Sequence, residues 1–296
     1  MTQSTEKISV VINCFNGDKY LNKAVESVLS QTYKNWEIIF WDNCSNDESK
    51  NIIKSYGDPR IIYYRSEKHT SQYEARRMAV TKCNSEFIAF LDVDDWWDDR
   101  KLEEQIKLFK DKSIGFACCN YWIVNQRKKK NKRLAFSQIP SGNVTEQLLK
   151  RNFVGMSTLM IRKESYFKLD YGFDPNYEII GDYDLVLRLS EINMLASIEK
   201  PLSYYRWHGE NLGFRKFDLN IKELKKWIGK SSKFKKYKNF EYLIDYTNFY
   251  NSLINIQNKK RDKACKGLFI IKNPFLKLKL LLLIILPLWL INKLRS

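Results

Sequence analysis

The sequence predicts an α/β fold in which a mainly parallel sheet carries helices on both faces, followed by a helical tail that is basic and then apolar. Apolar runs with strand character alternate with segments of helical periodicity through the first ninety residues. Acidic residues follow directly after two of those runs, and the positive charge collects at the C-terminal end. A length of 296 residues allows one large or two smaller domains.

Four buried strands are predicted in the first ninety residues. Their β-branched and aromatic runs cover residues 8–12, 36–41, 61–64 and 87–91. Helical spacing through 21–31, a polar helix start at 45–48 and a helical segment at 75–82 separate them. Strands that alternate with helices in this way require right-handed crossovers, and the sheet is therefore predicted to be parallel.

The second half of the chain predicts a mixed extension of this sheet and then an accessory region. A helix is expected beyond Leu102, and apolar segments around Phe116, Leu159 and Leu202 predict further strands. Lys-rich helical patterns begin near Phe217. We therefore expect a catalytic domain over 1–210 and a helical, Lys-rich accessory region over 211–296.

Composition excludes several classes of protein. A mean hydropathy of −0.47 excludes a polytopic membrane protein, and 44% apolar with 29% charged residues is typical of a globular chain. The six cysteines form no CxxC pair, so neither a zinc site nor a disulfide framework is predicted. Because no secretion signal opens the chain, we expect an intracellular protein.

The net charge of +17 belongs to the tail. Residues 1–210 hold 31 Lys and Arg against 29 Asp and Glu, whereas residues 211–296 hold 20 against 5. A separate basic run over 127–133 is expected to be a solvated loop. Residues 280–291 are wholly apolar but shorter than the roughly 20 needed to cross a bilayer. We therefore expect 275–291 to bind an anionic membrane surface peripherally, on its cytoplasmic side, rather than nucleic acid.

The strongest chemical signal is the sequence Asp92-Val93-Asp94-Asp95, directly after the fourth strand. Three neighbouring carboxylates repel one another unless a cation or hydrogen-bond donors compensate. Oxygen ligands suit Mg²⁺ or Mn²⁺, ions that keep open positions for phosphate oxygens. Asp42 follows the second strand, at the edge where parallel sheets bind ligands. An acidic loop or a helix cap is the alternative interpretation of the three acids.

The chain resembles the family 2 glycosyltransferases, which have the GT-A fold. The similar segments occur in the family's order over residues 8–211. They are VVINCFN at 10–16, DNCSND at 42–47, AR at 75–76, LDVDDWWDDRKL at 91–102, GFD at 172–174 with GDYDL at 181–185, and YRWH at 205–208.

The resemblance implies an inverting transfer of sugar from a nucleotide diphosphate sugar, with a UDP-sugar expected, to a hydroxyl of a lipid-linked or surface glycan. Asp182 would be the general base, in a setting distinct from that of the metal-site carboxylates. Asp94 would bind Mn²⁺ or Mg²⁺, and His208 would bind the metal or the diphosphate. The remaining implied nucleotide-sugar contacts are Asn13 and Phe15 at the base, Asp42 on the base, Asp92 on the ribose, Val93 beside it, and Arg76 at the diphosphate.

Several positions depart from the family pattern, and simpler interpretations of the site residues stay open. Asn13 replaces a usual proline, and Gly181 stands where a Glu often precedes the base. Asp182 could cap the helix that it opens, Arg76 could pair on its own helix, and His208 could be a satisfied strand residue. A nucleotidyltransferase and a non-catalytic membrane adaptor are the alternative functions.

Overall fold

The computed structural model describes residues 6–126, 131–208, 211 and 216–287. These residues fall into two compact units. The first unit consists of the chain up to Thr145 together with 152–211, and the second consists of 146–151 together with the chain from 212 onward. The second unit is therefore built from two separate stretches of sequence.

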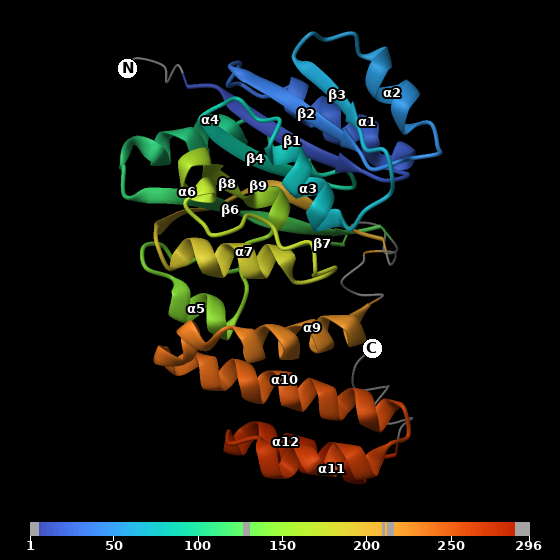
Figure 1. Cartoon of the computed structure of the whole chain (residues 1–296), viewed down its shortest axis with the longest axis vertical. Helices are drawn as coiled ribbons and strands as arrows, with labels where there is room; N and C mark the ends of the chain where they lie inside the picture. The colour runs from blue at the N-terminus through green and yellow to red at the C-terminus, as the bar shows by residue number, and fades with distance from the viewer. Residues whose placement is uncertain (1–5, 127–130, 209–210, 212–215, 288–296) are drawn as a thin grey trace. The chain divides into compact units, whose positions relative to one another are not determined.

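The first four strands of the first unit are parallel, in the order β3-β2-β1-β4 (Figure 1). Each is followed by a helix or a turn that returns the chain to the opposite edge, as the alternating periodicity predicts. The elements are β1 (Ile8–Cys14), α1 (Asp18–Leu29), β2 (Trp36–Asp42), α2 (Ser49–Ser55), β3 (Ile61–Arg65), α3 (Gln72–Val80) and β4 (Phe87–Asp92).

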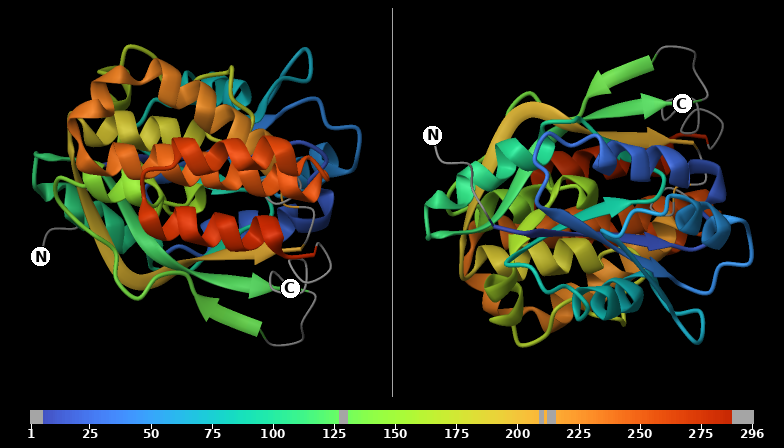
Figure 2. Two further views of the ribbon diagram at one scale, coloured as in Figure 1. Left: turned by 90° about the horizontal axis from the view of Figure 1, so that it is seen from below. Right: turned by 90° about the horizontal axis from the view of Figure 1, so that it is seen from above.

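Helices cover both faces of these strands. Val10 and Ile12 of β1 belong to the same buried cluster as Leu21 and Val25 of α1. Side chains alternate across a strand, so Val11 lies on the other face, where α3 packs against β1 and β2. The view from above separates α1 and α3 on opposite sides of the sheet (Figure 2, right). The predicted α/β class is confirmed.

The sheet continues beyond β4 as a mixed extension in the order β8-β6-β9-β5. β8 pairs antiparallel with both β4 and β6, and the long β6 and β9 run parallel through three register irregularities. The elements are β5 (Trp96–Trp97), α4 (Lys101–Ile106), β6 (Ile114–Asn125), β7 (Asn131–Leu134), β8 (Met160–Arg162), α6 (Lys163–Phe167), α7 (Gly181–Ser190) and β9 (Met194–Trp207). One-turn 3₁₀ helices occur at η1 (Lys107–Lys110) and η2 (Met156–Thr158).

The solvated loop predicted at 127–133 is partly wrong. Residues 131–134 form β7, which pairs antiparallel with β6 from Trp122 to Asn125. Lys132 stands 4.2 Å from the centre of the Trp122 ring, so its charge is placed on an aromatic face as well as near solvent. Residues 127–130 lie outside the described part of the chain.

Strand register brings the predicted ligand-binding residues to one edge. Cys14 of β1 lies opposite Asp42 of β2, and Asn13 lies opposite Asp92 of β4. All three strands end there in the same direction. The carboxyl edge of the parallel strands is therefore acidic, as the sequence predicts.

The second unit is helical. Its elements are most of α5 (Thr145–Lys150), α9 (Phe217–Lys230), the 3₁₀ segment η3 (Ser232–Lys236), α10 (Lys238–Gln257), α11 (Arg261–Ile270) and α12 (Pro274–Ile285). Phe249, Ile256, Ala264 and Leu280 bury one apolar cluster among the last three helices. Within the described residues, none of the helices has both the length and the apolar character that crossing a membrane requires. Residues 288–291 of the predicted anchor are outside the described chain.

Replacing two glycines of the second unit by alanine is predicted to have opposite effects on stability. A Cβ at Gly267 would lie 2.2 Å from Ser252 Oγ and 2.9 Å from a Leu280 methyl, whereas a Cβ at Gly229 of α9 would meet nothing within 4 Å. We expect Gly267→Ala to lower the free energy of unfolding by about 1–3 kcal/mol through overpacking. Gly229→Ala should raise it by about 0.5–1 kcal/mol through helix propensity. Urea denaturation of the two variants measures both values, and equal effects would contradict the close helix packing at residue 267.

Candidate functional site

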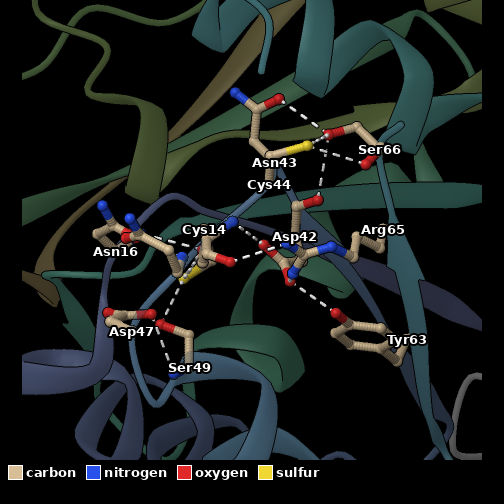
Figure 3. A network of polar contacts seen from close by, with 12 residues as sticks. Cys14, Asn16, Asp42, Asn43, Cys44, Asp47, Ser49, Tyr63, Arg65 and Ser66 are labelled. Carbon is tan, nitrogen blue, oxygen red and sulfur yellow. Dashed lines mark hydrogen bonds and ion pairs between the residues drawn. The ribbon is translucent and has the colours of Figure 1, made fainter. Parts of the chain in front are cut away.

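Asp42, at the end of β2, is the centre of a buried polar network (Figure 3). Its Oδ1 accepts a hydrogen bond from the Ser45 backbone N at 2.7 Å. Its Oδ2 accepts bonds from the Tyr63 hydroxyl and from Arg65 Nη1, both at 2.6 Å. The Asp42 side chain has no exposed surface, so this carboxylate joins β2 to β3 and closes the loop after β2.

The same network fixes the loop after β1 against the loop after β2 (Figure 3). Ser45 Oγ accepts a bond from the Asn16 backbone N, and Ser49 Oγ accepts one from Gly17 N, both at 3.0 Å. Asp47 Oδ2 accepts a bond from Asp18 N at 2.9 Å, at the start of α1. Asn16 has a φ of 52°, in the left-handed region that Asn tolerates better than most residues. Backbone geometry at this edge is thus set by side-chain acceptors.

The predicted base-pocket residues lie beside this network. Asn13 Nδ2 donates to the Gln72 carbonyl, but Asn13 Oδ1 is buried and has no hydrogen-bond partner among the described residues. Phe15 is 49% exposed, and its ring centre is 4.0 Å from that of His69. A buried acceptor without a donor costs free energy, which a ligand that donates a hydrogen bond can recover. The site therefore combines an aromatic face with one unsatisfied acceptor.

The acidic motif after β4 distributes its carboxylates among different partners. Asp92 forms an ion pair with the buried Arg76 of α3. Asp94 Oδ2 lies 3.0 Å from His208 Nε2, directly after β9. Asp95 is buried, where its Oδ2 accepts from Ser157 Oγ at 2.6 Å and its Oδ1 from the Arg206 backbone N at 2.9 Å. Residues 114 positions apart in the chain thus meet at this motif.

Burial and mutual repulsion disfavour the ionised forms of two of these acids. Burial and the neighbouring Asp94 raise the pKa of Asp92, although the Arg76 guanidinium opposes that rise. Burial, with Asp94 and Asp92 nearby, raises the pKa of Asp95 well above its ordinary value. This edge of the sheet therefore holds more carboxylate groups than its internal cations neutralise.

Arg206 ties the acidic motif to the end of β9. Its Nε donates to the Asp94 carbonyl at 2.6 Å. Its guanidinium carbon lies 4.6 Å from the ring centres of both Tyr20 and Trp96. The Tyr20 ring also stacks on His208, with 5.2 Å between centres. Cation–π contact on both rings holds Arg206 and so orients the Asp94 backbone and His208.

Two protein ligands fit a divalent cation with open coordination positions. Among the described side chains, no group of three or more His, Cys, Asp and Glu residues gathers as a complete metal site. Asp94 and His208 supply one oxygen and one nitrogen donor close together. The excess of carboxylate at Asp92 and Asp95 favours a nearby cation. This donor set fits Mn²⁺ or Mg²⁺ that takes further ligands from phosphate and water.

Asp182 stands in the first turn of α7, apart from the acidic motif in sequence. Its Oδ1 lies 2.7 Å from the Tyr183 backbone N and 3.3 Å from the Tyr73 hydroxyl. Burial raises the pKa of Asp182, and the Arg76 guanidinium opposes that rise. Arg76 thus acts electrostatically on both Asp92 and Asp182, so the two acids share one environment.

Tyr73 occupies the space that a side chain at residue 181 would need. A Cβ at Gly181 would lie 2.5 Å from Tyr73 Cδ2. Tyr73 is buried, stacks on Phe173, and donates its hydroxyl proton to the Ile179 carbonyl at 2.7 Å. The absence of a side chain at position 181 therefore lets Tyr73 approach and support the turn that carries Asp182.

The structure brings most of the predicted site residues to one edge of the sheet. Asn13, Arg76, Asp92 and Asp182 are linked by strand register and electrostatics, and Asp94 pairs with His208. Val93 packs there too, because a Cβ at Gly17 would lie 2.8 Å from one of its methyl groups. Asp42 differs in having both oxygens engaged by protein donors.

Sequence reasoning missed several residues that hold this edge together: Tyr63, Arg65, Tyr73, Ser157 and Arg206. The departure at Gly181 was the available signal for Tyr73, since a glycine often marks a close approach by another group. Ser157 carries no sequence signal, because a lone serine is common in any turn. Arg206 lies within the YRWH segment, but without a role assigned to it.

Comparison with known proteins gives a family match and relatives of similar length. The family model described as Glycosyl transferase family 2 matches residues 9–168. The putative teichuronic acid biosynthesis glycosyltransferase TuaG of Bacillus subtilis is 31% identical over 73% of this chain and 85% of its own. An Escherichia coli protein, the UDP-Glc:alpha-D-GlcNAc-diphosphoundecaprenol beta-1,3-glucosyltransferase WfgD, is 29% identical over 74% and 83%.

A solved structure shares the fold at low sequence identity. The mannosyltransferase PcManGT from Pyrobaculum calidifontis, in complex with GDP-Man and Mn²⁺, superposes with a TM-score of 0.61. Its sequence is 14% identical, and the match covers 88% of this chain and 73% of that one. The likeness concerns the fold, and it agrees with the α/β architecture described above.

The burial of Asp42 predicts a stability effect that does not depend on any ligand. Asp42→Ala would leave the Tyr63 hydroxyl, Arg65 and the Ser45 backbone N without their acceptor, and we expect it to lower the free energy of unfolding by about 3 kcal/mol. Asp58→Ala is the matched control, because Asp58 pairs with a partly exposed Arg60 in a turn. That change should cost less than about 1 kcal/mol. Chemical denaturation measures both, and similar losses would show that the buried network adds nothing.

Proposed function

The chain belongs to glycosyl transferase family 2, and from that membership we propose that it transfers a sugar from a nucleotide diphosphate sugar to an acceptor hydroxyl with inversion at the anomeric carbon. Asp182 is proposed as the general base. Residues up to 210 are proposed as the catalytic domain and residues from 211 as an accessory region.

The observation that carries this proposal is the position of Arg76 between two acids. It forms an ion pair with Asp92, and its charge opposes the rise in the pKa of Asp182 that burial causes. A glycosyl transfer needs a cationic, phosphate-binding side and a proton-accepting side around one sugar carbon. Arg76 links these two sides through its ion pair with Asp92 and through the effect of its charge on Asp182. It therefore supports an arrangement in which the donor diphosphate and the acceptor hydroxyl approach the same carbon from opposite directions.

In the proposed reaction the acceptor oxygen attacks the anomeric carbon as the bond from that carbon to the diphosphate oxygen breaks. The hydroxyl proton passes to Asp182. Among the described residues, the Tyr183 backbone N donates to Asp182 Oδ1, and the Tyr73 hydroxyl lies nearest the same oxygen, so Oδ2 is the oxygen proposed to accept the proton. Partial burial raises the pKa of this carboxyl, because its charged form is less well solvated than in water, and so makes Asp182 a stronger base. The leaving nucleoside diphosphate keeps the electron pair of the bond that breaks.

The donor-side contacts are proposed from the remaining residues. Phe15 offers an exposed ring, and Asn13 Oδ1 an unsatisfied acceptor, for a nucleobase that donates hydrogen bonds. Asp92 is proposed at the ribose, with Val93 beside it and Arg76 at the diphosphate. Because Asp42 is fully engaged, we propose that it shapes this pocket through the loop after β2, and that contact with the base requires release of the partly exposed Arg65.

Asp94 and His208 are proposed to hold Mn²⁺ or Mg²⁺. A cation at this position would neutralise charge on the departing diphosphate when bound. Arg206 would keep both ligands oriented through its bond to the Asp94 carbonyl and its contact with Tyr20. A relative of the same fold was solved with Mn²⁺, which supports the proposal.

The donor and acceptor classes are proposed from the relatives. WfgD is named for transfer from UDP-Glc to a diphosphoundecaprenol-linked sugar, and TuaG for teichuronic acid biosynthesis. We propose a UDP-sugar as the donor and a lipid-linked or cell-surface glycan as the acceptor. We propose that the reaction takes place at the cytoplasmic face of the membrane, where a peripheral enzyme would reach a lipid-linked acceptor.

Asp182→Asn tests the base. The assay measures UDP release from a UDP-sugar in the presence of Mn²⁺ and a lipid-linked acceptor. We expect the rate to fall by roughly 10²–10⁴-fold, because the Asn side chain cannot accept the proton of the acceptor hydroxyl. The KM for the donor should change little. A coupled assay of nucleoside diphosphate release measures the rate. Running it with UDP-, GDP- and dTDP-sugars identifies the nucleobase of the donor.

Asp170→Asn, at an exposed aspartate of the same unit, is the control and should retain the wild-type rate. Near wild-type turnover by Asp182→Asn would remove the assigned base. Release of pyrophosphate from a nucleoside triphosphate, without turnover of any nucleotide sugar, would instead support a nucleotidyltransferase.

Arg76→Met tests the electrostatic link through the pH profile. Loss of the guanidinium removes what opposes the raised pKa of Asp182, so that pKa should rise further. A general base works only when deprotonated, and the acidic limb of kcat/KM should therefore move to higher pH. Arg76→Lys keeps the charge and should restore the wild-type limb. An unchanged limb in Arg76→Met, with the fold intact by circular dichroism, would disprove the coupling.

A further inference from the structure

The helices α11 and α12 carry two apolar stripes, of which the structure buries one. Toward α10, Leu280 is buried in the apolar cluster, and Leu276, Leu283 and Ile284 pack against it. On the outside, Phe275, Leu278, Leu282 and Ile285 are 73%, 57%, 55% and 70% exposed. The outer residues recur at intervals of three and four, which is the spacing of one helix face. Helix α12 is therefore apolar on two opposite sides, and one side has no partner among the described residues.

The exposed stripe continues onto the end of α11. Phe269 is 88% exposed and Ile270 is 55% exposed, and α11 packs against α12. The two helices lie side by side in the view from below (Figure 2, left). A typical monomer exposes no single apolar patch larger than about 300–600 Å² without a functional reason. Six large apolar side chains of these two helices are each more than half exposed, and such a concentration indicates an interaction surface.

Lysines border the stripe on both sides. At about 100° per residue, Lys277 falls between the outer stripe and one edge of the packed face of α12, and Lys279 falls at the other edge. Both are exposed, as are Lys263 and Lys266 of α11. Between residues 259 and 287 the chain has eight Lys and Arg against a single acid, Asp262. An apolar stripe between two cationic borders is the pattern of a helix that lies in a membrane interface.

We propose that this face of α11 and α12 docks in the plane of an anionic lipid bilayer, with the outer stripe in the acyl boundary and the bordering lysines at the phosphate level. Charge decides between this partner and a second copy of the chain. A symmetric dimer through the same face would bring the lysines of both copies together, whereas anionic headgroups neutralise them. Long lysine side chains reach outward to the headgroups while their methylenes follow the apolar surface.

Helix length fixes how deeply the face can enter. Helix α12 has 12 residues, so it is about 18 Å long and shorter than the hydrocarbon core of roughly 30 Å. Pro274 starts the helix, Asn273 caps it by accepting a bond from Leu276 N, and the exposed Pro287 follows its end. Arg261 of α11 donates to the carbonyls of Ile284, in the last turn of α12, and of Leu286, directly after the helix. These contacts hold α12 against α11, parallel to the proposed surface.

Membrane docking by this face does not depend on sugar transfer, because none of these residues belongs to the proposed catalytic machinery.

Vesicle binding by the full chain tests the proposal. We expect the protein to float with vesicles of phosphatidylcholine and phosphatidylglycerol in equal parts, and at least ten-fold less with phosphatidylcholine alone. The variant Leu278→Glu with Leu282→Glu should lose at least ten-fold in affinity for the mixed vesicles. The variant Lys277→Gln with Lys279→Gln should lose roughly five-fold for each lysine and depend less on salt.

Matched controls come from the first unit. Phe167→Glu with Ile192→Glu changes two apolar side chains of similar exposure, 55% and 51%, and Lys110→Gln with Lys112→Gln removes two exposed lysines. Both should bind vesicles as the wild type does. Circular dichroism and thermal melting verify that each variant is folded, and UDP release with a water-soluble acceptor reports the enzymatic site separately.

Two results would overturn the proposal. One is equal vesicle binding by the wild type and by Leu278→Glu with Leu282→Glu. The other is a dimer of the wild type in solution that the same change dissociates, without any binding to anionic vesicles, since that would assign the face to a second copy. Loss of sugar transfer with intact vesicle binding would contradict the proposed function alone.

Discussion

Ionised side chains that leave water must find compensating partners, and this constraint organises the carboxyl edge of the sheet. Five aspartates from β2, β4, the turn after β4 and α7 gather at or near this edge. Each has a different partner. Asp42 accepts from Tyr63 and Arg65, Asp92 pairs with Arg76, Asp94 contacts His208, Asp95 accepts from Ser157, and Asp182 accepts from the Tyr183 backbone N. The partners of Asp94 and Asp95 come from distant parts of the chain, so satisfying these acids also joins the parallel half of the sheet to its mixed extension.

Two arginines perform this compensation in different ways. Arg76 is buried on α3 and acts through its charge on Asp92 and Asp182. Arg206 acts mainly through its backbone and its planar group, which bonds the Asp94 carbonyl and lies against Tyr20 and Trp96. A planar guanidinium suits the second role because it can stack and donate at the same time, which a lysine ammonium cannot do. The two sides of the proposed reaction centre are thus held by groups that are not themselves the proposed base or metal ligands.

The sequence was sufficient for the parts of this molecule that depend on local pattern. β-branched runs predicted the four parallel strands, and the direction of those strands placed Asp42 and Asp92 at one edge. Local sequence pattern could not predict contacts between residues that are distant in the chain. The approach of Tyr73 to Gly181 joins positions more than a hundred residues apart, and Ser157 meets Asp95 across 62 residues. The strand at 131–134 was missed because its lysine and arginine suggested solvent, whereas pairing with β6 determines its conformation.

Residues 146–151 belong to the second unit, although the chain on both sides of them belongs to the first. Truncating the gene therefore cannot separate the two units cleanly. The chain leaves the first unit at Thr145, contributes a short helical stretch to the second, and returns at Asn152. Glu146 there accepts hydrogen bonds from the backbone N of Lys238 and Asn239 at the start of α10. A shortened gene that stops after residue 211 would still encode Leu148 and Leu149, both buried in the intact chain, without the helices of their own unit. The helical tail is therefore not a detachable appendage, and evolution could exchange it only together with an internal hexapeptide.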